Sequence, residues 1–568
     1  MTESIITDIL DEYEQITNNL GLSLKTKVEQ FLQSKEMLHD PDVNNLLHSF
    51  EIDKSFEGLR TLEEQMEILT NNTEYIKPQE IPLDKRIENA IDKKTGTSVP
   101  RIILKTCQYV SIIDSLTMVL RNKDIRAVIE AEKESNDGIL ASFIDGQHFK
   151  NHPFFQKYKL AIRIQLYYDE LEIVNPLGSK TGIHKLGVFY YTIQNLPSHM
   201  NSETSSIHVL LLCCHVDIQK YKMKKILSPF LEDLVKLESD EGVVILSEEQ
   251  EYILRASLTA FVGDGLAVHE VFNLLGPSSH FFCRMCLYTR QDLHNDSIEI
   301  KQSRNMAVYN EHLNLLHNAN YSDNAKTLTG MHGECCLHSS RFFHICKNLI
   351  FDPMHDILCG IGPMILKLVL IRYTLEIKLF HINDFNNRIA SFQYGFVERK
   401  NKPSANFSER ILRVKGHTLN QKAMQIWCLF RVFPFLISDW VLTGEEHLQL
   451  ILILLRIMEI VFAPKVTVFL MSYLRALIID FLETFKQLFP DVHMINKFHH
   501  LTHYPDCMLW SGPLQLYNCM RYEAKHNEIK LRAQNVHNFK NPPKTLIRIV
   551  LKVLDGEKEM PQLFELSH

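Results

Sequence analysis

The chain has 568 residues, of which 45% are hydrophobic and 23% charged; the length predicts two to four domains, and the composition excludes a largely disordered or collagen-like protein. Its twelve cysteines are too few for a disulfide scaffold, so some are expected to be metal ligands. With 61 basic and 68 acidic residues, the net charge is −7. Proteins that coat DNA are usually basic, so this charge disfavours DNA coating but leaves room for a local basic groove.

Membrane insertion and secretion are not expected. No stretch reaches the ~18 uncharged apolar residues of a membrane span, and the nearest one, 448–463, is interrupted by Arg456 and Glu459. The N-terminus shows no basic stretch followed by an apolar run, the pattern of a secretion signal.

The first part of the chain is expected to be mainly helical. Residues 1–100 are predicted to form a weakly helical region and a linker, because 71–99 is polar and contains Pro78, Pro82 and Gly96. Residues 101–158 are predicted to form a helical segment before the core, with one or two amphipathic helices within 103–134.

Strand signals concentrate in 159–290. Residues 162–169 alternate between apolar and polar side chains, the period of a strand. The predicted elements, in order, are strands over 162–169, 188–193 and 207–216, a helix over 220–237, a strand within 252–262 and a helix over 266–275. This order predicts an α/β fold with a mixed sheet and flanking helices.

Apolar residues at helical spacing dominate the second half of the chain. They predict an all-helical region over 291–490. Residues 491–568 are predicted to form a loop around Pro505 and Gly512-Pro513, followed by a charged helix.

Three acidic residues stand where α/β enzymes bind metals. Asp169 ends the first predicted strand, Asp264 ends the fourth between two glycines, and Glu523 lies on the late helix. Open α/β sheets bind ligands at the carboxyl ends of their strands, and carboxylates suit Mg²⁺ or Mn²⁺. Together the three can hold a metal pair for phosphodiester chemistry. Taken singly, the aspartates are typical of turns or caps and Glu523 of a solvated helix face.

Two cysteines and two histidines form a second candidate site. Cys283 and Cys286 are a Cys-x2-Cys pair, and His499 and His503 are spaced i, i+4 on one helical face. Zn²⁺ prefers four tetrahedral sulfur and nitrogen ligands. Such a split site would clamp the segment after the fourth strand to the segment before the acidic helix. An isolated Cys-x2-Cys pair is equally typical of redox or core cysteines.

Other metal-ligand patterns leave alternatives open. His500 competes as a zinc ligand. A rival cluster, able to bind the same or a second metal, comprises His332, Cys335, Cys336 and His338. The block Asp352-Pro-Met-His355-Asp356 can also bind metal, although a buried hydrogen-bonded cap is the better interpretation.

Basic residues near the acidic helix have two interpretations. They can contact phosphates or form an ordinary charged helix face. They are Arg521, Lys525, Lys530, Arg532 and Lys540.

The order and spacing of these motifs resemble CACTA-type (EnSpm/CMC) DDE transposases, over roughly 103–545. The string from Tyr168 to Gly178 resembles their first-aspartate segment, Gly263-Asp264 with Cys283-x2-Cys286 resembles the second, and 352–356 resembles a block between the two halves. Their terminal block is matched by His499-x3-His503, Gly512-Pro513-Leu514 and 521–526.

The resemblance implies an RNase H-like core over 159–290, interrupted by a helical insertion over 291–490 and completed by 491–568. It also implies nuclear, metal-dependent DNA strand cleavage and joining by a homo-oligomer at transposon ends or derived sites. Asp169, Asp264 and Glu523 would hold Mg²⁺ or Mn²⁺. Cys283, Cys286, His499 and His503 would form a structural zinc knuckle, an arrangement also similar to the catalytic subunit of the V(D)J recombinase.

Two features set the sequence apart from a full-length element protein. It has an acidic net charge and no clear DNA-binding module at the N-terminus, which favours a truncated or host-domesticated copy. The alternative function is a catalytically inactive DNA- or protein-binding scaffold on the same fold. An unrelated metallohydrolase is disfavoured because neither aspartate has a His-x-His or His-Glu-x-x-His motif nearby.

Overall fold

The computed structural model divides the chain into two compact units. The first comprises 1–78, 532–539 and 548–568, and the second comprises 79–531 and 540–547. The residues described are 3–35, 47, 64, 67, 75–91, 97–173, 185–247, 250–295, 298–299, 301–442, 444–534 and 541–558. In the first unit, the predicted N-terminal helix is confirmed as α1 (Glu3–Gln33).

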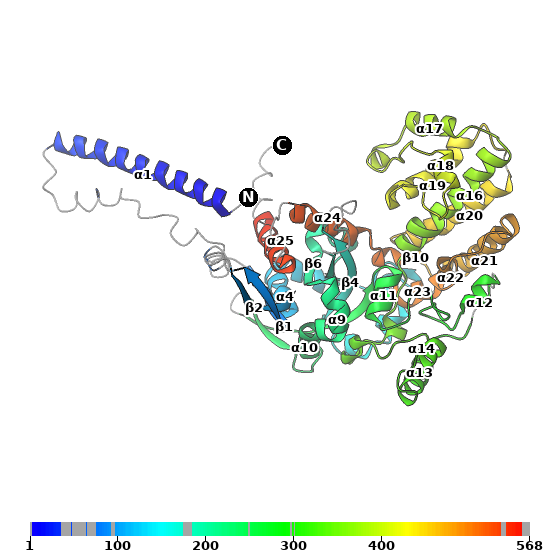
Figure 1. Ribbon diagram of the computed structural model, residues 1–568, viewed down its shortest axis with the longest axis horizontal. Helices are drawn as coiled ribbons and strands as arrows, with labels where there is room; N and C mark the ends of the chain where they lie inside the picture. The colour runs from blue at the N-terminus through cyan, green and yellow to red at the C-terminus, as the bar shows by residue number, and fades with distance from the viewer. Residues whose placement is uncertain are drawn as a thin grey trace. The chain divides into compact units, whose positions relative to one another are not determined.

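A six-stranded mixed sheet forms the centre of the second unit (Figure 1). Its strand order is β1-β2-β6-β5-β4-β9. The strands are β1 (Gln79–Ile91), β2 (Ser98–Tyr109), β4 (Ile162–Glu172), β5 (Lys185–Ile193), β6 (His208–Cys214) and β9 (Ala256–Val262). β4, β5 and β6 are antiparallel neighbours, and β9 runs parallel to β4. The predicted α/β class is therefore confirmed.

The side chains of β4 alternate between the two faces of the sheet, and both faces are covered by other parts of the chain. Ile164, Leu166 and Tyr168 lie in the main hydrophobic core. The helices packed around this core are α4 (Ile112–Arg121), α9 (His215–Ile226), α10 (Ser228–Leu237) and α11 (Gly265–Val271). The intervening Gln165 and Tyr167 are also buried, because the opposite face of the sheet is covered from the C-terminal part of the chain.

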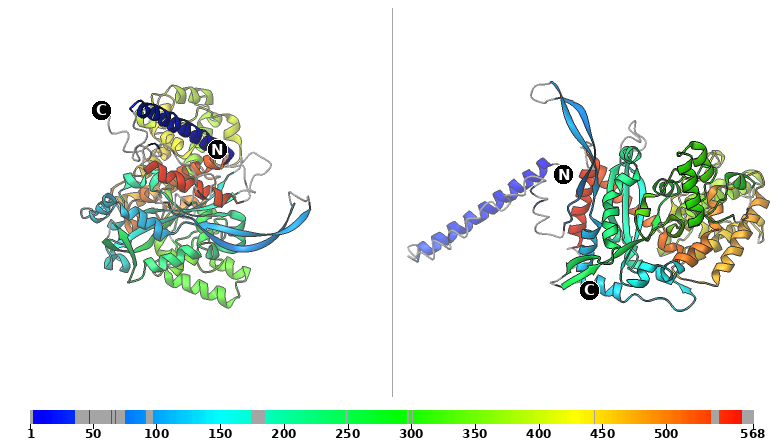
Figure 2. Two further views of the ribbon diagram at one scale, coloured as in Figure 1. Left: turned by 90° about the vertical axis from the view of Figure 1, so that its left-hand side faces the viewer. Right: turned by 90° about the horizontal axis from the view of Figure 1, so that it is seen from below.

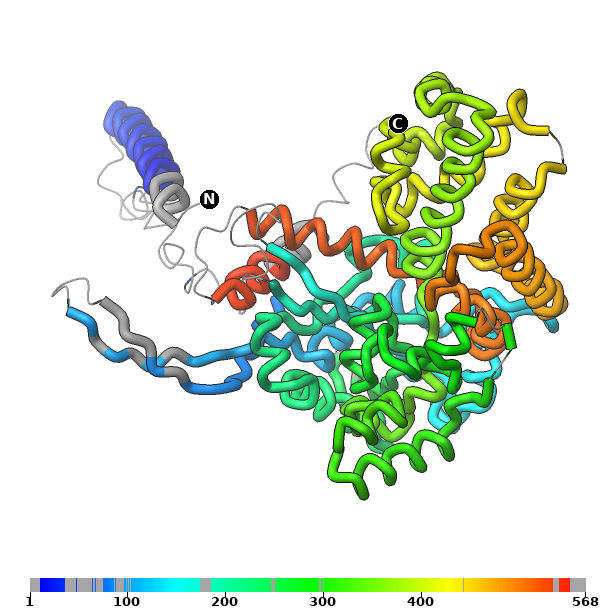
Figure 3. Tube along the Cα trace, turned by 45° about the vertical axis from the view of Figure 1, so that its right-hand side comes forward, coloured from blue at the N-terminus to red at the C-terminus, as the bar shows by residue number. Residues whose placement is uncertain are grey.

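Helix α24 (Met520–Gln534) provides that second cover (Figures 1 and 3). The ring of Tyr522 stacks on Tyr167 of β4, with 4.3 Å between ring centroids and 3° between planes. The Tyr522 hydroxyl lies 2.9 Å from Thr192 Oγ1 of β5. These contacts confirm the predicted late helix and place its first turn against β4 and β5.

The linker predicted over 71–99 and the helix predicted from 103 are wrong between residues 79 and 109. Strands β1 and β2 pair along most of their length there. Only Gln108 and Tyr109 of this hairpin pair with β6, so it extends beyond the rest of the sheet (Figure 2). Cross-strand pairing outweighed the polar composition of β1. Helices α4 and α5 (Lys123–Glu130) confirm the remainder of the prediction.

Three other predicted elements need smaller corrections. The helix over 220–237 is two helices, α9 and α10. The strand within 252–262 is split at Arg255 into β8 (Gln250–Leu254), which pairs with β7 (Val243–Ser247), and β9. Pro505 lies in the first turn of α23 (Tyr504–Ser511) rather than in a loop, a position where proline's missing N–H is tolerated. The sequence Asn175-Pro-Leu-Gly178, whose composition predicts a turn after the first strand, lies outside the described residues.

The region predicted to be helical contains helices and short irregular segments, and it belongs to the same compact unit as the sheet. Its longer helices are α13 (Met306–Asn318), α16 (Gly362–Ile371), α17 (Ile382–Ser391), α19 (Ala423–Ile437), α20 (Glu446–Val461) and α21 (Leu470–Leu488). Strand β10 (Val466–Thr467) pairs with β3 (Ile139–Leu140), joining this region to the segment before the core.

Among the described residues, one continuous helical stretch, Met354–Glu376, is by length and composition apolar enough to cross a membrane, although Lys367 and Arg372 keep it below the expected ~18 uncharged apolar residues. It comprises the π-helix η4 (Met354–Ile361), α16 and η5 (Arg372–Glu376). However, 78% of its apolar window is buried inside the protein. Lys367 within it donates hydrogen bonds to the carbonyls of Val414 and Gly416, as in the core helix of a globular protein.

Candidate functional site

The four predicted zinc ligands come together in one buried cluster. Cys283 and Cys286 follow α11, His499 lies in α22 (Asn496–Leu501), and His503 is the N-cap of α23. Their ligand atoms all lie within 4.8 Å of one another. Cys283 Sγ is 3.4 Å from His503 Nε2, Cys286 Sγ is 3.1 Å from His499 Nε2, and the two Nε2 atoms are 3.1 Å apart.

This geometry fits a tetrahedral zinc ion. Ligands at about 2.3 Å (sulfur) and 2.0–2.1 Å (nitrogen) from one Zn²⁺ leave adjacent ligand atoms about 3.3–3.8 Å apart, close to the separations seen here. Two thiols and two imidazoles, all buried, also match the closed donor set of a structural site. The interpretation of Cys283 and Cys286 as ordinary core cysteines is disfavoured, because both face histidine nitrogens.

The electrostatics of the two thiols favour a bound dication. Burial raises the pKa of Cys283, but the hydrogen bond from Cys286 and the nearby histidines outweigh burial and hold the pKa well below 9. The pKa of Cys286 is raised, first by its hydrogen bond with Cys283 and then by burial. The paired thiols therefore hinder each other's ionisation, and a bound metal ion would supply the charge that ionises both.

The residues that the sequence offered as alternative zinc ligands lie outside the Cys2His2 cluster. His500 Nδ1 is 2.9 Å from Asp356 Oδ1, and the other carboxylate oxygen of Asp356 accepts from Tyr504. This buried network joins η4 to α22 and α23. Among the described residues, the rival His332–His338 cluster does not form a ligand group: His332 is exposed, and His338 Nε2 accepts from the backbone of Ile345.

Two of the three predicted catalytic carboxylates meet on the α24 side of the sheet. Asp169 near the end of β4 and Glu523 in the first turn of α24 form a ligand group with His526, with the ligand atoms within 4.8 Å of one another. His526 Nε2 is 3.4 Å from Asp169 Oδ2. The Tyr167 hydroxyl lies 3.2 Å from Asp169 Oδ2 and 3.3 Å from Glu523 Oε1. We call Asp169, Glu523 and His526 the carboxylate cluster.

Asp264 lies at the neighbouring strand end but is not in that ligand group. In the parallel β4–β9 ladder Tyr167 pairs with Val262, and Asp169 and Asp264 each follow their strand partner by two residues. Asp264 is the N-cap of α11, where its Oδ1 accepts from the backbone N–H of Ala267 at 2.6 Å. A capping role is therefore established for Asp264, while its role as a metal ligand stays a prediction.

His355 on η4 approaches the carboxylate cluster from the helical region. Its Nδ1 lies 2.5 Å from Asp352 Oδ2, and its Nε2 lies 3.7 Å from Glu523 Oε1. Asp352 also accepts from the backbone N–H groups of Met354 and Cys519. The cap interpretation of Asp352 is confirmed, whereas His355 additionally faces the predicted site.

The two carboxylates differ in pKa direction. Burial opposes ionisation of Asp169, but its interactions with His526 and weaker contributions from its surroundings lower the pKa below the usual value. The pKa of Glu523 is raised by burial and then by the negative charge of Asp169. Pairs of carboxyl groups with pKa values pushed apart are typical of functional sites, and a dication would relieve their mutual repulsion.

Sequence reasoning missed His526 and Tyr167 as members of the site. The spacing Glu523-x-x-His526 places both side chains on one face of α24, and this signal could have identified the histidine. Tyr167 carried no comparable signal, because its role depends on the way α24 covers the sheet.

The predicted basic residues do not act as one group. Lys525 is buried and pairs with Glu528 at 2.8 Å. Arg521 and Lys530 are exposed. Lys540 lies outside the described residues.

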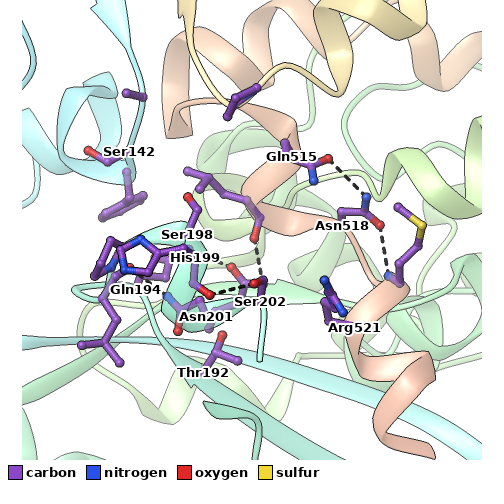
Figure 4. Close-up of a pocket in the computed structure, with 18 of the residues that line it drawn as sticks. Ser142, Thr192, Gln194, Ser198, His199, Asn201, Ser202, Gln515, Asn518 and Arg521 are labelled. Atoms are coloured by element: carbon purple, nitrogen blue, oxygen red, sulfur yellow. Dashed lines mark hydrogen bonds between the residues drawn. The ribbon is translucent and has the colours of Figure 1, made fainter. Parts of the chain in front are cut away.

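A cavity of about 1280 Å³ lies at the start of α24 (Figure 4), where Arg521, Tyr522 and Ala524 line it but the residues of the carboxylate cluster do not. Polar side chains from the end of β5 and the residue after it, from α8 (Ser198–Asn201) and from the start of α24 and the residues before it face the cavity, including Thr192, Gln194, His199, Asn201, Asn518 and Arg521. Basic side chains lining it are Lys133, Lys400, Lys465 and Arg521. With Glu132 as its acidic lining residue, the cavity combines a net positive charge with many hydrogen-bonding groups.

No protein-family model matches the chain, and a search of curated proteins finds no significant relative.

Proposed function

We propose that the protein is a transposase-derived enzyme of the CACTA DDE type, which cuts and joins DNA strands by two-metal-ion chemistry. The observation that carries this proposal is the meeting of Asp169, from a central strand, with Glu523, from a helix more than 350 residues later in the chain. Asp264 at the adjacent strand end supplies the third acidic residue.

The sheet topology supports an RNase H-like core. Strands β4, β5 and β6 form an antiparallel meander, and β9 returns parallel to β4 on its other side. Phe261 of β9 also forms a single parallel bridge with Leu349, where a fifth strand would continue such a sheet. The long helical region then separates this core from α24, as expected for an insertion.

The residues of the site fit metal-dependent phosphodiester chemistry. Divalent cations bound there would activate a water or 3′-hydroxyl and stabilise the leaving oxygen. Asp169 and Glu523 would hold the ions, and the Tyr167 hydroxyl between them orients both carboxylates. The basic cavity beside α24 suits a DNA strand, because phosphate contacts position nucleic acid, and it offsets the acidic net charge locally. A role on DNA implies a nuclear protein.

Nicking of a supercoiled plasmid tests this function, because it reports a single strand cut without knowledge of the target sequence. We expect nicking by the zinc-loaded protein with Mg²⁺ or Mn²⁺, and a loss of at least 100-fold in Asp169→Asn and in Glu523→Gln. Glu299→Gln, an exposed acidic residue outside the site, is the matched control. Equal nicking by wild type and both variants would refute the assignment.

We also propose that copies of the chain associate through α1. Tyr13, Ile16, Leu20, Leu24 and Phe31 are exposed, and at 100° per residue they lie within an arc of about 80°. A seam this narrow is typical of a coiled coil between copies of a chain. Light scattering should show a multimer that Leu20→Glu dissociates and that Leu22→Glu, on the opposite face of α1, leaves intact. A monomeric wild type would contradict it.

A non-catalytic DNA- or protein-binding scaffold is the second candidate. It is favoured by one observation: Asp264 already satisfies a helix N-terminus instead of joining the carboxylate cluster. On this alternative, cellular function survives Asp169→Asn and Glu523→Gln but not loss of the zinc ligands.

A further inference from the structure

The orientation of His355 points to a ligand of the carboxylate cluster beyond the acidic residues. Asp352 is almost completely buried and holds His355 Nδ1 at 2.5 Å. Because a carboxylate only accepts hydrogen bonds, Nδ1 carries the proton of this pair. A carboxylate that orients one ring nitrogen so that the other faces a metal is the recurrent arrangement around metal-binding histidines.

The second ring nitrogen of His355 faces Glu523. Its Nε2 lies 3.7 Å from Glu523 Oε1, beyond a normal hydrogen bond but close to the separation of two ligands on one ion. The backbone carbonyl of His355 accepts from Lys497 at 2.6 Å, so the π-helix η4 is fixed at this residue. π-helical turns are rare and frequently occur at functional sites.

His526 repeats this arrangement on the Asp169 side. Its ring is almost completely buried, with Nδ1 3.2 Å from the Tyr190 hydroxyl and Nε2 3.4 Å from Asp169 Oδ2. Each carboxylate of the cluster therefore has one imidazole nitrogen beside it, and each imidazole is oriented through its second nitrogen.

We propose that His355 and His526 bind the divalent cations of the carboxylate cluster directly, and that the site therefore selects Mn²⁺ over Mg²⁺. Mg²⁺ demands hard oxygen ligands, whereas imidazole nitrogen suits later first-row metals, among which affinity rises from Mn²⁺ onwards. This inference rests on the proposed function for its site, but its test needs no DNA.

The first measurement is cation binding to the zinc-loaded full chain. Calorimetric titration with MnCl₂ and with MgCl₂ should give at least 10-fold tighter binding of Mn²⁺. His355→Ala should weaken Mn²⁺ binding by 10-fold or more and Mg²⁺ binding less, so that the selectivity falls. His332→Ala removes an exposed histidine outside the cluster and should change neither affinity.

The second measurement reports the ligand atoms. Pulsed electron paramagnetic resonance of bound Mn²⁺ should detect hyperfine coupling to histidine nitrogen, diminished in His355→Ala and in His526→Ala and retained in His332→Ala. If either variant fails to fold, the wild-type spectrum alone decides the question. Bound Mn²⁺ without nitrogen coupling, no Mn²⁺ binding, or unchanged selectivity in a folded His355→Ala would each overturn the inference. Nitrogen coupling in a protein that does not nick DNA would instead refute only the proposed enzymatic function.

Discussion

The Cys2His2 cluster and the carboxylate cluster each join segments that are distant in the sequence, yet they are enclosed differently. The first joins the segment after α11 to α22 and α23, and the second joins β4 to α24. All four residues of the Cys2His2 cluster are buried, whereas the side chains of Asp169 and Glu523 remain 19% and 38% exposed. A closed ligand set stabilises a fold, and an open one leaves room for a substrate. The enclosure of the Cys2His2 cluster thus fits a structural centre, and the partial exposure of the carboxylate cluster is what the proposed catalytic role requires.

The largest expected effect is removal of the zinc ion. Cys286→Ser should abolish stoichiometric zinc and unfold the region around α22 and α23, because structural zinc contributes on the order of 10 kcal/mol. Elemental analysis and thermal denaturation measure this. Cys359→Ser changes an exposed cysteine outside the cluster and should retain both zinc and melting temperature. A variant that loses zinc but keeps its melting temperature would remove the structural role.

The next-largest expected effect is a loss of stability on acidification, at the contact between α6 and α23. His148 of α6 (Gln147–Lys150) stacks on Trp510 of α23 at 5.1 Å, and burial, followed by the charges of His152 and Lys347, lowers its pKa to about 3. Since the unfolded state binds this proton more readily, stability is lost as pH falls from about 6.5 towards 3.

Between pH 7 and pH 5 this residue alone should cost about 2 kcal/mol. Urea unfolding at both pH values should show a smaller loss in His148→Phe, which keeps the aromatic stacking without the titrating nitrogen. The same loss in both proteins would show that His148 does not titrate as its burial predicts.

A smaller effect separates the two roles of Asp264. Asp264→Ala should lower the free energy of unfolding by about 1 kcal/mol, because the α11 cap is lost. Asp264→Ser keeps a capping oxygen and should stay near wild-type stability. If Asp264 also binds metal, both variants should lose plasmid nicking equally. Full nicking by Asp264→Ser would restrict this residue to capping.

The smallest expected effect is the change in stability caused by Glu523→Gln, and its sign should reverse when metal is bound. Glu523→Gln removes a negative charge beside Asp169 and should stabilise the metal-free protein by less than ~1 kcal/mol, given the partial exposure of the side chain. With millimolar Mn²⁺ the wild type should become the more stable protein, because only it retains the full ligand set. Thermal denaturation with and without Mn²⁺ measures both. Stability that responds to Mn²⁺ identically in both proteins would contradict a ligand role for Glu523.

Sequence patterns correctly predicted those strands and helices in which the spacing of apolar residues matches the face that is buried. β4 and β5 alternate or run apolar along a buried sheet, and α20 and α21 repeat at helical spacing, so their local signals agree with the fold. The β1–β2 hairpin was not predicted, because pairing between its two strands, rather than the composition of either strand, determines this structure. The Cys2His2 group was predictable, since the Cys-x2-Cys pair and the i, i+4 histidines together match the donor set of a zinc site, although neither pair is specific by itself.

The carboxylate cluster was only partly predictable. Strand ends and helix position indicated Asp169 and Glu523, but the approach of His355 depends on how η4 packs against α22 through Lys497 and Asp356. Such contacts between segments distant in sequence leave no local pattern. Capping by Asp264 was the expected role of such an aspartate taken singly, and the structure shows it, but an aspartate after a strand has the same sequence signature whether it caps a helix or binds an ion.

The sequence separation within the Cys2His2 cluster has a consequence for biosynthesis. Cys286 and His499 are 213 residues apart. At translation speeds of about 5–20 residues per second, the cysteine pair leaves the ribosome roughly 10–40 s before its histidine partners exist. During that interval the nascent chain carries two reducing thiols without their final ligand shell. Oxidants and other soft metal ions should therefore modify the nascent chain more readily than the folded protein. The cellular yield should then depend on conditions that keep thiols reduced during synthesis.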